Sequence, residues 1–157
     1  MILRRATAED LPALRDIAER AYSVYVERIG RRPRPMDDDY DERLRRARVF
    51  VADDGGVVVG LIVLIATPDH VLVENVAVDP AHQRAGIGRA LLSLAEEYAG
   101  ELGVDRLRLY TNVTMIENIR LYTRLGYEED GRHIGDGFAR VHMSKRVRTR
   151  RPRDARE

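Results

Sequence analysis

The stretch that decides the fold runs from Leu72 to Arg89 and reads LVENVAVDPAHQRAGIGR. Its first half is an apolar run that predicts a buried strand, and a short turn follows at Asp79-Pro80. A glycine-rich loop then leads into a run with helical periodicity. A strand that feeds a glycine loop and a helix presents free backbone N–H groups at the helix N-terminus, and such groups bind anions. The stretch therefore predicts an anion site.

The rest of the chain is expected to add elements around this stretch in the order β–α–α–β–β–β–α–β–α–β–β. Apolar residues spaced by three and four predict helices, and apolar runs bounded by turn residues predict strands. Hairpins come first and βαβ units later, which predicts an α/β fold of the α+β type, with helices on both faces of a mixed sheet. The expected helices are Leu11–Ile29, Asp37–Arg46, Ala90–Leu102 and Ile116–Leu125, and the expected strands are Ile2–Arg5, Arg48–Ala52, Val57–Ala66, Val71–Val78, Arg106–Tyr110, Tyr127–His133 and Phe138–Ser144.

Helix boundaries are expected at three places in the first third of the chain. Thr7 is the predicted N-cap of the first helix, because acidic residues follow it in the first turn. The segment 31–35, with two prolines, predicts an extended connector that is incompatible with a helix. Asp37 or Asp38 is the expected cap of the second helix.

Length and composition predict one globular domain. The chain has 157 residues, of which 44% are hydrophobic and 34% are charged, and these values are ordinary for a single soluble domain. The absence of cysteine excludes disulfides, thiolate metal ligands and a cysteine nucleophile. No apolar run approaches the ~20 residues that span a bilayer, and no apolar segment follows the N-terminal arginines. A cytoplasmic protein without membrane contact is expected.

Charge is distributed unevenly along the chain. Seven of the 27 basic residues and two of the 26 acidic ones lie from Lys145 onward, so the preceding part is mildly acidic. We expect a domain over residues 1–145 and a basic, disordered tail over residues 146–157. The tail contains no aromatic residue, and nucleic acid is not an expected partner.

The segment 83–91 has three possible interpretations as a glycine loop. A P-loop requires a lysine, and the chain has none before Lys145, which excludes this kind. A dinucleotide fingerprint requires three glycines directly after a strand, but position 91 is leucine and about seven residues separate the loop from the strand. The pattern that remains is Q-x-x-G-x-G from Gln83 to Gly88, after the strand end V-A-V-D-P.

This combination resembles the GCN5-related N-acetyltransferase (GNAT) family. The resemblance extends over Glu74–Pro80, Gln83–Leu92, Met115–Tyr122 and Leu125–Tyr127, where the motif L-Y-x-x-L-G-Y occurs. It implies a single-domain GNAT fold, with a mostly antiparallel sheet of six or seven strands in which a central pair splays apart. It also implies acetyl-CoA as the acyl donor and no metal ion.

The resemblance assigns cofactor-binding roles to the residues around the loop. Backbone groups of the strand would bind the pantetheine arm, and the loop would bind the pyrophosphate with help from the helix dipole. The side chains of Arg84 and Arg89 would add positive charge or remain solvated. Asn118 would bind the cofactor arm or serve as a cap, although the family's asparagine is replaced here by Met115. The assigned residues are Val76, Ala77, Val78, Gln83, Arg84, Ala85, Gly86, Ile87, Gly88, Arg89 and Asn118.

Two residues are candidates for the chemistry. Glu74 lies where many members of the family place a base, and its carboxylate would remove a proton from the attacking amine. The alternative is that Glu74 faces solvent or pairs with an arginine. Tyr122 matches the family tyrosine that protonates the leaving thiolate, and the alternative for Tyr122 is core packing.

The acceptor is not identified by the resemblance. Its cleft would be formed by the first two helices, the connector 31–36 and the last hairpin near 138–140. Arginines and tyrosines there favour an acceptor with a carboxylate or phosphate, whereas Asp37–Asp39 would favour a polycation. The four histidines lack metal-ligand spacing, and one of them is an acceptor candidate. The candidate residues are Tyr22, Tyr25, Arg28, Met36, Tyr40 and His142.

Three functions remain open on the sequence alone. The preferred one is acetyl transfer to a small amine or amino-acid-like molecule in a ternary complex. The second is acetylation of a protein lysine or N-terminus, and the third is a non-catalytic acyl-CoA-binding regulatory domain. Assembly into a homodimer is also left open.

Overall fold

A seven-stranded mixed sheet forms the centre of the computed structural model, which describes residues 1–150. The strand order is β1-β2-β3-β4-β5-β7-β6. The central pair β4 and β5 is parallel, and the other neighbouring pairs are antiparallel. The strands are β1 (Ile2–Arg5), β2 (Arg48–Asp54), β3 (Val57–Ala66), β4 (Val71–Val78), β5 (Arg106–Asn112), β6 (Glu128–Gly135) and β7 (Phe138–Arg146).

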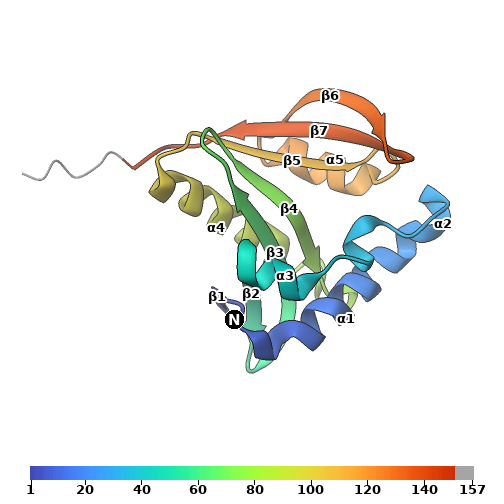
Figure 1. Ribbon diagram of the computed structural model, residues 1–157, viewed down its shortest axis with the longest axis vertical. Coiled ribbons are helices and arrows are strands. Elements are labelled where there is room, and N and C mark those ends of the chain that lie inside the picture. Colours follow the sequence, from blue (N-terminus) through green and yellow to red (C-terminus); the bar gives the residue numbers. More distant parts are fainter. Residues whose placement is uncertain (151–157) are drawn as a thin grey trace, which may run out of the picture.

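Helices cover both faces of the sheet (Figure 1). On one face, α1 (Leu11–Tyr22) and α3 (Tyr40–Arg46) bury a core with residues such as Leu14 and Val51. On the other, α4 (Ile87–Leu102) and α5 (Ile116–Arg124) bury a second core around Leu91 and Leu107. The remaining helical segments are α2 (Val26–Ile29), η1 (Ala8–Asp10), η2 (Ser23–Tyr25), η3 (Arg34–Met36) and η4 (Pro80–His82). The predicted fold class is confirmed.

The central strands β4 and β5 separate after a short paired segment. Their pairing is limited to Val71–Val73 with Leu107–Leu109. A β-bulge begins at the same point, because Val73 lies opposite Leu64 and Asn75 opposite Val63, which leaves Glu74 as the extra residue. A bulge bends its strand and increases the local twist, so β4 turns away from β5. The predicted splay of a central pair is thereby confirmed.

The N-terminal helices differ in detail from the prediction. The single helix expected over Leu11–Ile29 is divided into α1, η2 and α2. The expected extended connector contains the short helix η3, because Pro33 precedes it as the N-cap and Pro35 is accepted in its first turn. The cap of α3 is Asp39, which accepts the Glu42 N–H, so the expectation of Asp37 or Asp38 was wrong by one residue. Thr7 forms the predicted N-terminal cap, in a capping box with Asp10.

The chain beyond β7 continues along the domain as far as it is described. The N–H of Val147 donates to the carbonyl of Asp105 at 2.8 Å, and that of Arg150 donates to the carbonyl of Gly100 at 3.2 Å. The tail that the sequence predicts to be disordered begins at residue 146. Its part from 151 to 157 lies outside the described residues. Within residues 1–150, no helix combines the length and the apolar character needed to cross a membrane.

Candidate active site

A cavity of about 540 Å³ opens where β4 and β5 separate. The two strands form its floor with Glu74, Asn75 and Tyr110, and α5 contributes Tyr122. The connector between α2 and α3 and the start of β7 form the outer walls. The site therefore lies where the sheet leaves backbone edges unpaired and side chains from several helices and strands converge.

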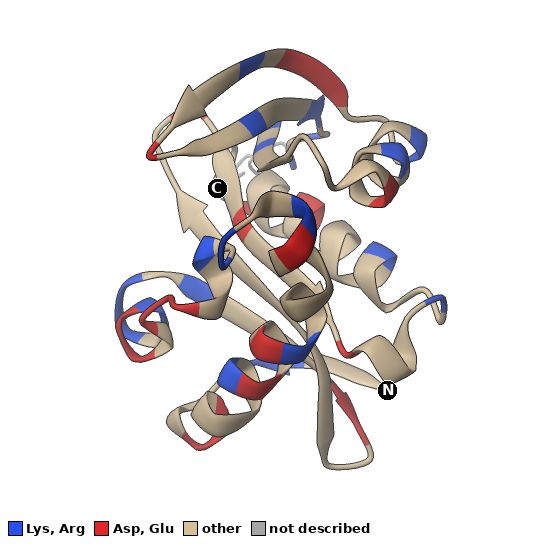
Figure 2. Ribbon diagram, turned by 90° about the vertical axis from the view of Figure 1, so that its right-hand side faces the viewer, with Lys and Arg blue, Asp and Glu red and all other residues tan. Residues whose placement is uncertain are grey.

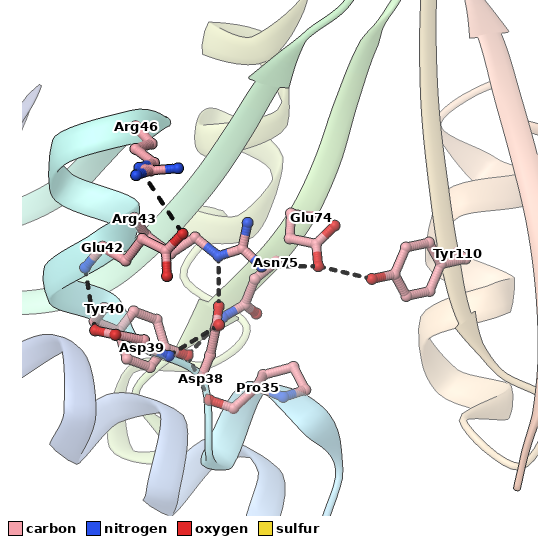
Figure 3. Close-up of polar contacts among 10 residues, drawn as sticks. All are labelled: Pro35, Asp38, Asp39, Tyr40, Glu42, Arg43, Arg46, Glu74, Asn75 and Tyr110. Carbon is pink, nitrogen blue, oxygen red and sulfur yellow. Dashed lines mark hydrogen bonds and ion pairs between the residues drawn. The ribbon is translucent and has the colours of Figure 1, made fainter. Parts of the chain in front are cut away.

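Glu74 is held by two neighbours inside this cavity (Figure 3). The Tyr110 hydroxyl donates to Glu74 Oε1 at 2.9 Å, and Arg43 Nη2 lies 3.5 Å from the same oxygen. Burial, together with the charge of Glu74, raises the pKa of Tyr110 to about 12, so its hydroxyl remains a donor at neutral pH. In the described part of the chain, no hydrogen bond occupies the second oxygen, Oε2. That oxygen is available to accept a proton.

Tyr122 approaches the cavity from α5, the helix on the other face of the sheet. The residue is 7% exposed, and its ring packs edge-on against Tyr127 with 5.8 Å between the centroids. Burial, and then the neighbouring Tyr25, raise the pKa of the Tyr122 phenol above its ordinary value. The phenol therefore stays protonated and is able to donate a proton within the cavity.

A second polar network ties β4 to the helices that wall the cavity (Figure 3). Asn75 Nδ2 donates to the Tyr40 hydroxyl at 2.9 Å, and that hydroxyl donates to the Pro35 carbonyl at 2.6 Å. Tyr22 donates from α1 to Asn75 Oδ1. Because these bonds connect α1, the connector and α3 to one strand residue, they hold this wall of the cavity in place.

The glycine loop connects η4 to α4 and has an unusual backbone. Arg84 and Gly86 both have positive φ angles, 69° and 78°, and Gly86 is the N-cap of α4. The first intrahelical bond runs from the Ala90 N–H to the Gly86 carbonyl. The N–H groups of residues 87–89 precede it and have no intrahelical acceptor, as is general for a helix start. Together with the helix dipole, they suit an anionic diphosphate.

An ion pair braces the turn that leads into this loop. Arg20 donates from α1 to both oxygens of Asp79, at 2.9 and 2.8 Å, and Asp79 Oδ1 also accepts the Ala81 N–H at 3.0 Å. Asp79 is 6% exposed. The contacts fix the direction in which β4 leaves the sheet and enters the loop.

The free edge of β4 leads directly to the loop. Val76, Ala77 and Val78 pair with β3 only, since β5 has already separated. A Cβ added at Gly88 would contact Val78 at 3.7 Å, which places the start of α4 against the end of the strand. Unpaired strand edges bind extended amide-containing segments through backbone hydrogen bonds. Edge and loop thus fit a ligand that joins an amide-containing arm to a diphosphate.

The structure brings some of the acceptor candidates to the cavity and places others elsewhere. Tyr22 lines the cavity, and so does Asn118, whose amide lies 3.7 Å from Met115 Sδ. Tyr40 belongs to the core at 1% exposure, which corrects its expected place in the wall. Arg28 pairs with Glu117 at 2.8 Å and covers the Tyr25 ring. The candidates outside the cavity wall are Tyr25, Arg28, Met36, Tyr40 and His142.

His142 faces a second, shallower hollow on the same sheet. Its ring stacks on His133 with 4.0 Å between the centroids and also contacts Tyr110. Burial, then the charges of His133 and Arg140, lower the pKa of His142. His142 does not line the first cavity, although its neighbour Tyr110 lines both hollows. Among residues 1–150, no group of His, Asp and Glu side chains is arranged to hold a metal ion.

Three residues of the site are not predicted by the sequence patterns. Asn75 interrupts an apolar strand directly after Glu74, and Tyr110 ends the alternating run RLRLY, so both carried a weak signal. Arg43 carried none, because it reaches Glu74 only through the packing of α3 against β4.

Known proteins match this chain in both sequence and fold. The model of the Acetyltransferase (GNAT) family matches residues 11–127. The uncharacterized N-acetyltransferase YvbK of Bacillus subtilis is 34% identical over 59% of this chain and 61% of its own length, which is less than two thirds of that relative. The [ribosomal protein bS18]-alanine N-acetyltransferase of Escherichia coli is 29% identical over 76% of each chain.

Solved structures show the same fold at lower sequence identity. The crystal structure of the Escherichia coli ribosomal-protein-S18-alanine N-acetyltransferase superposes with a TM-score of 0.77 at 23% identity, over 99% of both chains. The PaiA N-acetyltransferase of Thermoplasma acidophilum, solved in complex with coenzyme A, gives a TM-score of 0.80 at 17% identity, over 93% of this chain and 98% of that one.

Proposed function

Because the chain belongs to the acetyltransferase (GNAT) family, we propose that its domain of residues 1–145 transfers the acetyl group of acetyl-CoA to the primary amine of a small acceptor. The amine attacks the thioester directly while both substrates are bound. The new N–C bond forms as the C–S bond breaks, and the nitrogen loses one proton while the sulfur gains one. Two residues in the cavity are suited to move these protons.

The donor site proposed for acetyl-CoA follows β4 and the loop. Backbone groups of Val76–Val78 bind the pantetheine arm along the free strand edge, as in strand addition. The backbone of residues 83–89 binds the diphosphate, and the positive φ of Gly86 shapes that loop. The thioester supplied by acetyl-CoA then lies where the strands separate, beside Glu74 and Tyr122.

Glu74 is the proposed base for the amine. An alkyl amine with a pKa of ~10.4 is neutral in less than about one part in a thousand at pH 7. Removing its proton at this pH therefore costs a free energy of roughly 4–5 kcal/mol. Tyr110 and Arg43 hold Oε1 of the carboxylate, which leaves Oε2 to take the proton directly or through a water molecule.

Tyr122 is the proposed acid for the leaving thiolate. Its buried phenol carries a proton at neutral pH, and the proton is transferred as the C–S bond breaks. Burial raises the pKa of a thiol as well as that of a phenol, so the thiolate formed in this cavity is also a stronger proton acceptor than it is in water.

A contact across the mouth of the cavity supports a small acceptor. Arg31 Nη1 donates to the Asp136 carbonyl at 3.0 Å, and Arg34 Nη1 lies 3.6 Å from Asp136 Oδ2. These contacts join the connector to the turn between β6 and β7, so the two outer walls meet. A cavity narrowed in this way fits a single small molecule better than a polypeptide crossing the site.

The second candidate function is acetylation of a protein N-terminus. It is favoured by the relative from Escherichia coli, whose name states that it acts on the alanine of ribosomal protein bS18. A non-catalytic acyl-CoA-binding domain is the third candidate.

The test measures the release of CoA from acetyl-CoA with two classes of acceptor. The first class is small amines, and the second is peptides with a free N-terminal alanine. Turnover of a small amine above that of any peptide supports the proposal. Acetylation of peptides alone, measured by mass spectrometry, would assign the second function. Tight CoA binding without turnover of either class would assign the third.

A further inference from the structure

We infer that the acceptor is an amine that also carries an oxyanion, a carboxylate or a phosphate, and that Arg31 and Arg140 bind this group. The inference rests on the proposed acetyl transfer to a small amine and names the class of acceptor. It arises from the balance of charges in the cavity wall.

The carboxylates that line the cavity all have an arginine neighbour. Asp37 pairs with Arg32 at 3.0 Å, and Asp136 lies 3.6 Å from Arg34. Arg43 pairs with Asp38 at 2.9 Å and lies near Glu74. Asp39 completes the acidic run Asp37–Asp39, but it lies outside the cavity wall and caps α3. The two aspartates of this run that line the cavity, Asp37 and Asp38, are therefore neutralised locally and do not favour a polycation. Blue and red segments alternate on several helices in Figure 2.

Two arginines of the lining have no carboxylate partner in residues 1–150. Arg31 donates to the Asp136 carbonyl at 3.0 Å, and Arg140 donates to the Gly135 carbonyl at 3.3 Å. A guanidinium has five N–H donors, so each side chain keeps donors for a ligand. The cavity thus contains two charges that no described carboxylate compensates.

Phe138 contacts the guanidinium groups of both arginines. The Arg31 guanidinium carbon lies 4.2 Å from the centroid of the Phe138 ring, and that of Arg140 lies 5.0 Å from it. Gly137 permits this approach, because a Cβ at that position would collide with Arg31 Nη1. Both arginines border the same ring, and an oxyanion of the acceptor that reaches the two guanidinium groups would accept charge-assisted hydrogen bonds from them.

This anion subsite lies one aromatic ring away from the proposed base. Arg140 is positioned over the Tyr110 ring, 5.2 Å from its centroid, and the Tyr110 hydroxyl donates to Glu74. An acceptor with its ammonium group at Glu74 and its oxyanion at Arg31 and Arg140 would span that ring. The opposite charges at the two ends orient the acceptor so that its nitrogen faces the thioester.

The test compares acids with their neutral counterparts at saturating acetyl-CoA. The probes are glycine, 3-aminopropanoate, 4-aminobutanoate and 2-aminoethyl phosphate, together with the amides of the three carboxylic acids. Arg31→Gln and Arg140→Gln remove the proposed anion contacts. Arg132→Gln is the matched control, because Arg132 is on the same hairpin but pairs with Glu129 outside the cavity.

The expected result is a kcat/KM at least about tenfold higher for an acid than for its amide, since one charge-assisted hydrogen bond contributes at least that factor. Arg31→Gln and Arg140→Gln should abolish this preference mainly through KM, and Arg132→Gln should retain it. Comparison of the phosphate probe with the carboxylates identifies the preferred oxyanion.

Three results would overturn the inference. They are equal rates for acids and amides, a preference for acids that both arginine variants retain, and failure of every probe to bind the CoA-loaded protein in calorimetry. Failure of the proposed acetyl transfer is a separate result, in which neither these probes nor other small amines are acetylated, whether or not alanine peptides are.

Discussion

The hydroxyl of Tyr110 donates a 2.9 Å hydrogen bond to Oε1 of Glu74, across the opening between two strands that are no longer paired. Backbone pairing of β4 with β5 ends one residue earlier, at Val73 and Leu109. A side-chain contact thus replaces the backbone ladder where the cavity begins. It connects the proposed base to a donor that remains protonated throughout the neutral pH range.

Substitution of Glu74 by Gln is expected to lower kcat/KM by roughly 10²–10⁴-fold near pH 7, because the attacking amine loses its proton acceptor. The neutral fraction of the amine rises tenfold per pH unit below its pKa. The rate of the variant should therefore climb steeply between pH 6 and 9 and approach that of the wild type. Parallel pH profiles for the two proteins would remove Glu74 from the role of base.

Tyr110→Phe should give a smaller loss than Glu74→Gln. The variant keeps the ring and the 3.5 Å contact of Arg43 with Glu74 but removes one hydrogen bond to a charged group, which contributes about 1.5 kcal/mol or roughly tenfold in rate. The measurement is kcat at saturating acetyl-CoA. A loss as large as that of Glu74→Gln would contradict a positioning role.

Tyr122→Phe should lower kcat by about tenfold or more and leave acetyl-CoA affinity near that of the wild type. Only the hydroxyl is removed, so the edge-on packing against Tyr127 is kept and the variant should fold normally. Single-turnover kinetics would isolate the chemical step. An unchanged rate of that step would leave Tyr122 with a packing role only.

Gly86→Val should abolish binding of acetyl-CoA. Gly86 has a φ of 78° and open space around it, so valine strains the backbone by about 1–3 kcal/mol and disturbs the N–H groups of the loop. Gly103→Val is a matched control, because Gly103 ends the same helix with a φ of 77° and similar open space. Both variants should lose similar stability in urea unfolding. Calorimetry should show lost affinity for Gly86→Val alone, and equal affinities would mean that the loop does not bind the donor.

Asp10→Asn should make the protein less stable at neutral pH but not in acid. Hydrogen bonds from Arg4, at 2.8 and 2.9 Å, hold the pKa of Asp10 below its ordinary value. A carboxyl whose pKa is lowered by folding contributes stability above its unfolded pKa of about 3.9, and this contribution is lost as the pH falls through the folded pKa.

Urea unfolding of Asp10→Asn should show a loss of roughly 1.5–3 kcal/mol at pH 7, a range typical of hydrogen bonds to charged groups. The difference from wild type should shrink as the pH falls below 4. Asp41→Asn is the control, since Asp41 makes a surface pair with Arg45 that contributes little. A loss that is independent of pH would contradict the role of the Asp10 charge.

Local patterns in the chain were sufficient for the elements around the donor site. The strand Val71–Val78 has the bounds that its apolar run predicts, and α4 begins at Ile87, within the Q-x-x-G-x-G segment and three residues before the expected start at Ala90. Turn residues, apolar periodicity and the conformational freedom of Gly86 act within a few residues, so they can be read from the sequence. The helix limits near the connector were less accurate, because neighbouring aspartates compete for one cap.

The side of the cavity that is proposed to bind the acceptor depends on contacts between residues that are distant in the chain. Arg43 and Glu74 are 31 positions apart, and Tyr110 and Glu74 are 36 apart. The Glu74 bulge, the packing of α3 on the sheet and the meeting of Arg31 with the last hairpin bring these side chains together. Pairing also changes the charge balance of the cavity wall, because Asp37 and Asp38 have arginine partners while Arg31 and Arg140 have no carboxylate partner within residues 1–150. Such a balance follows from distances across the fold, which no local pattern encodes.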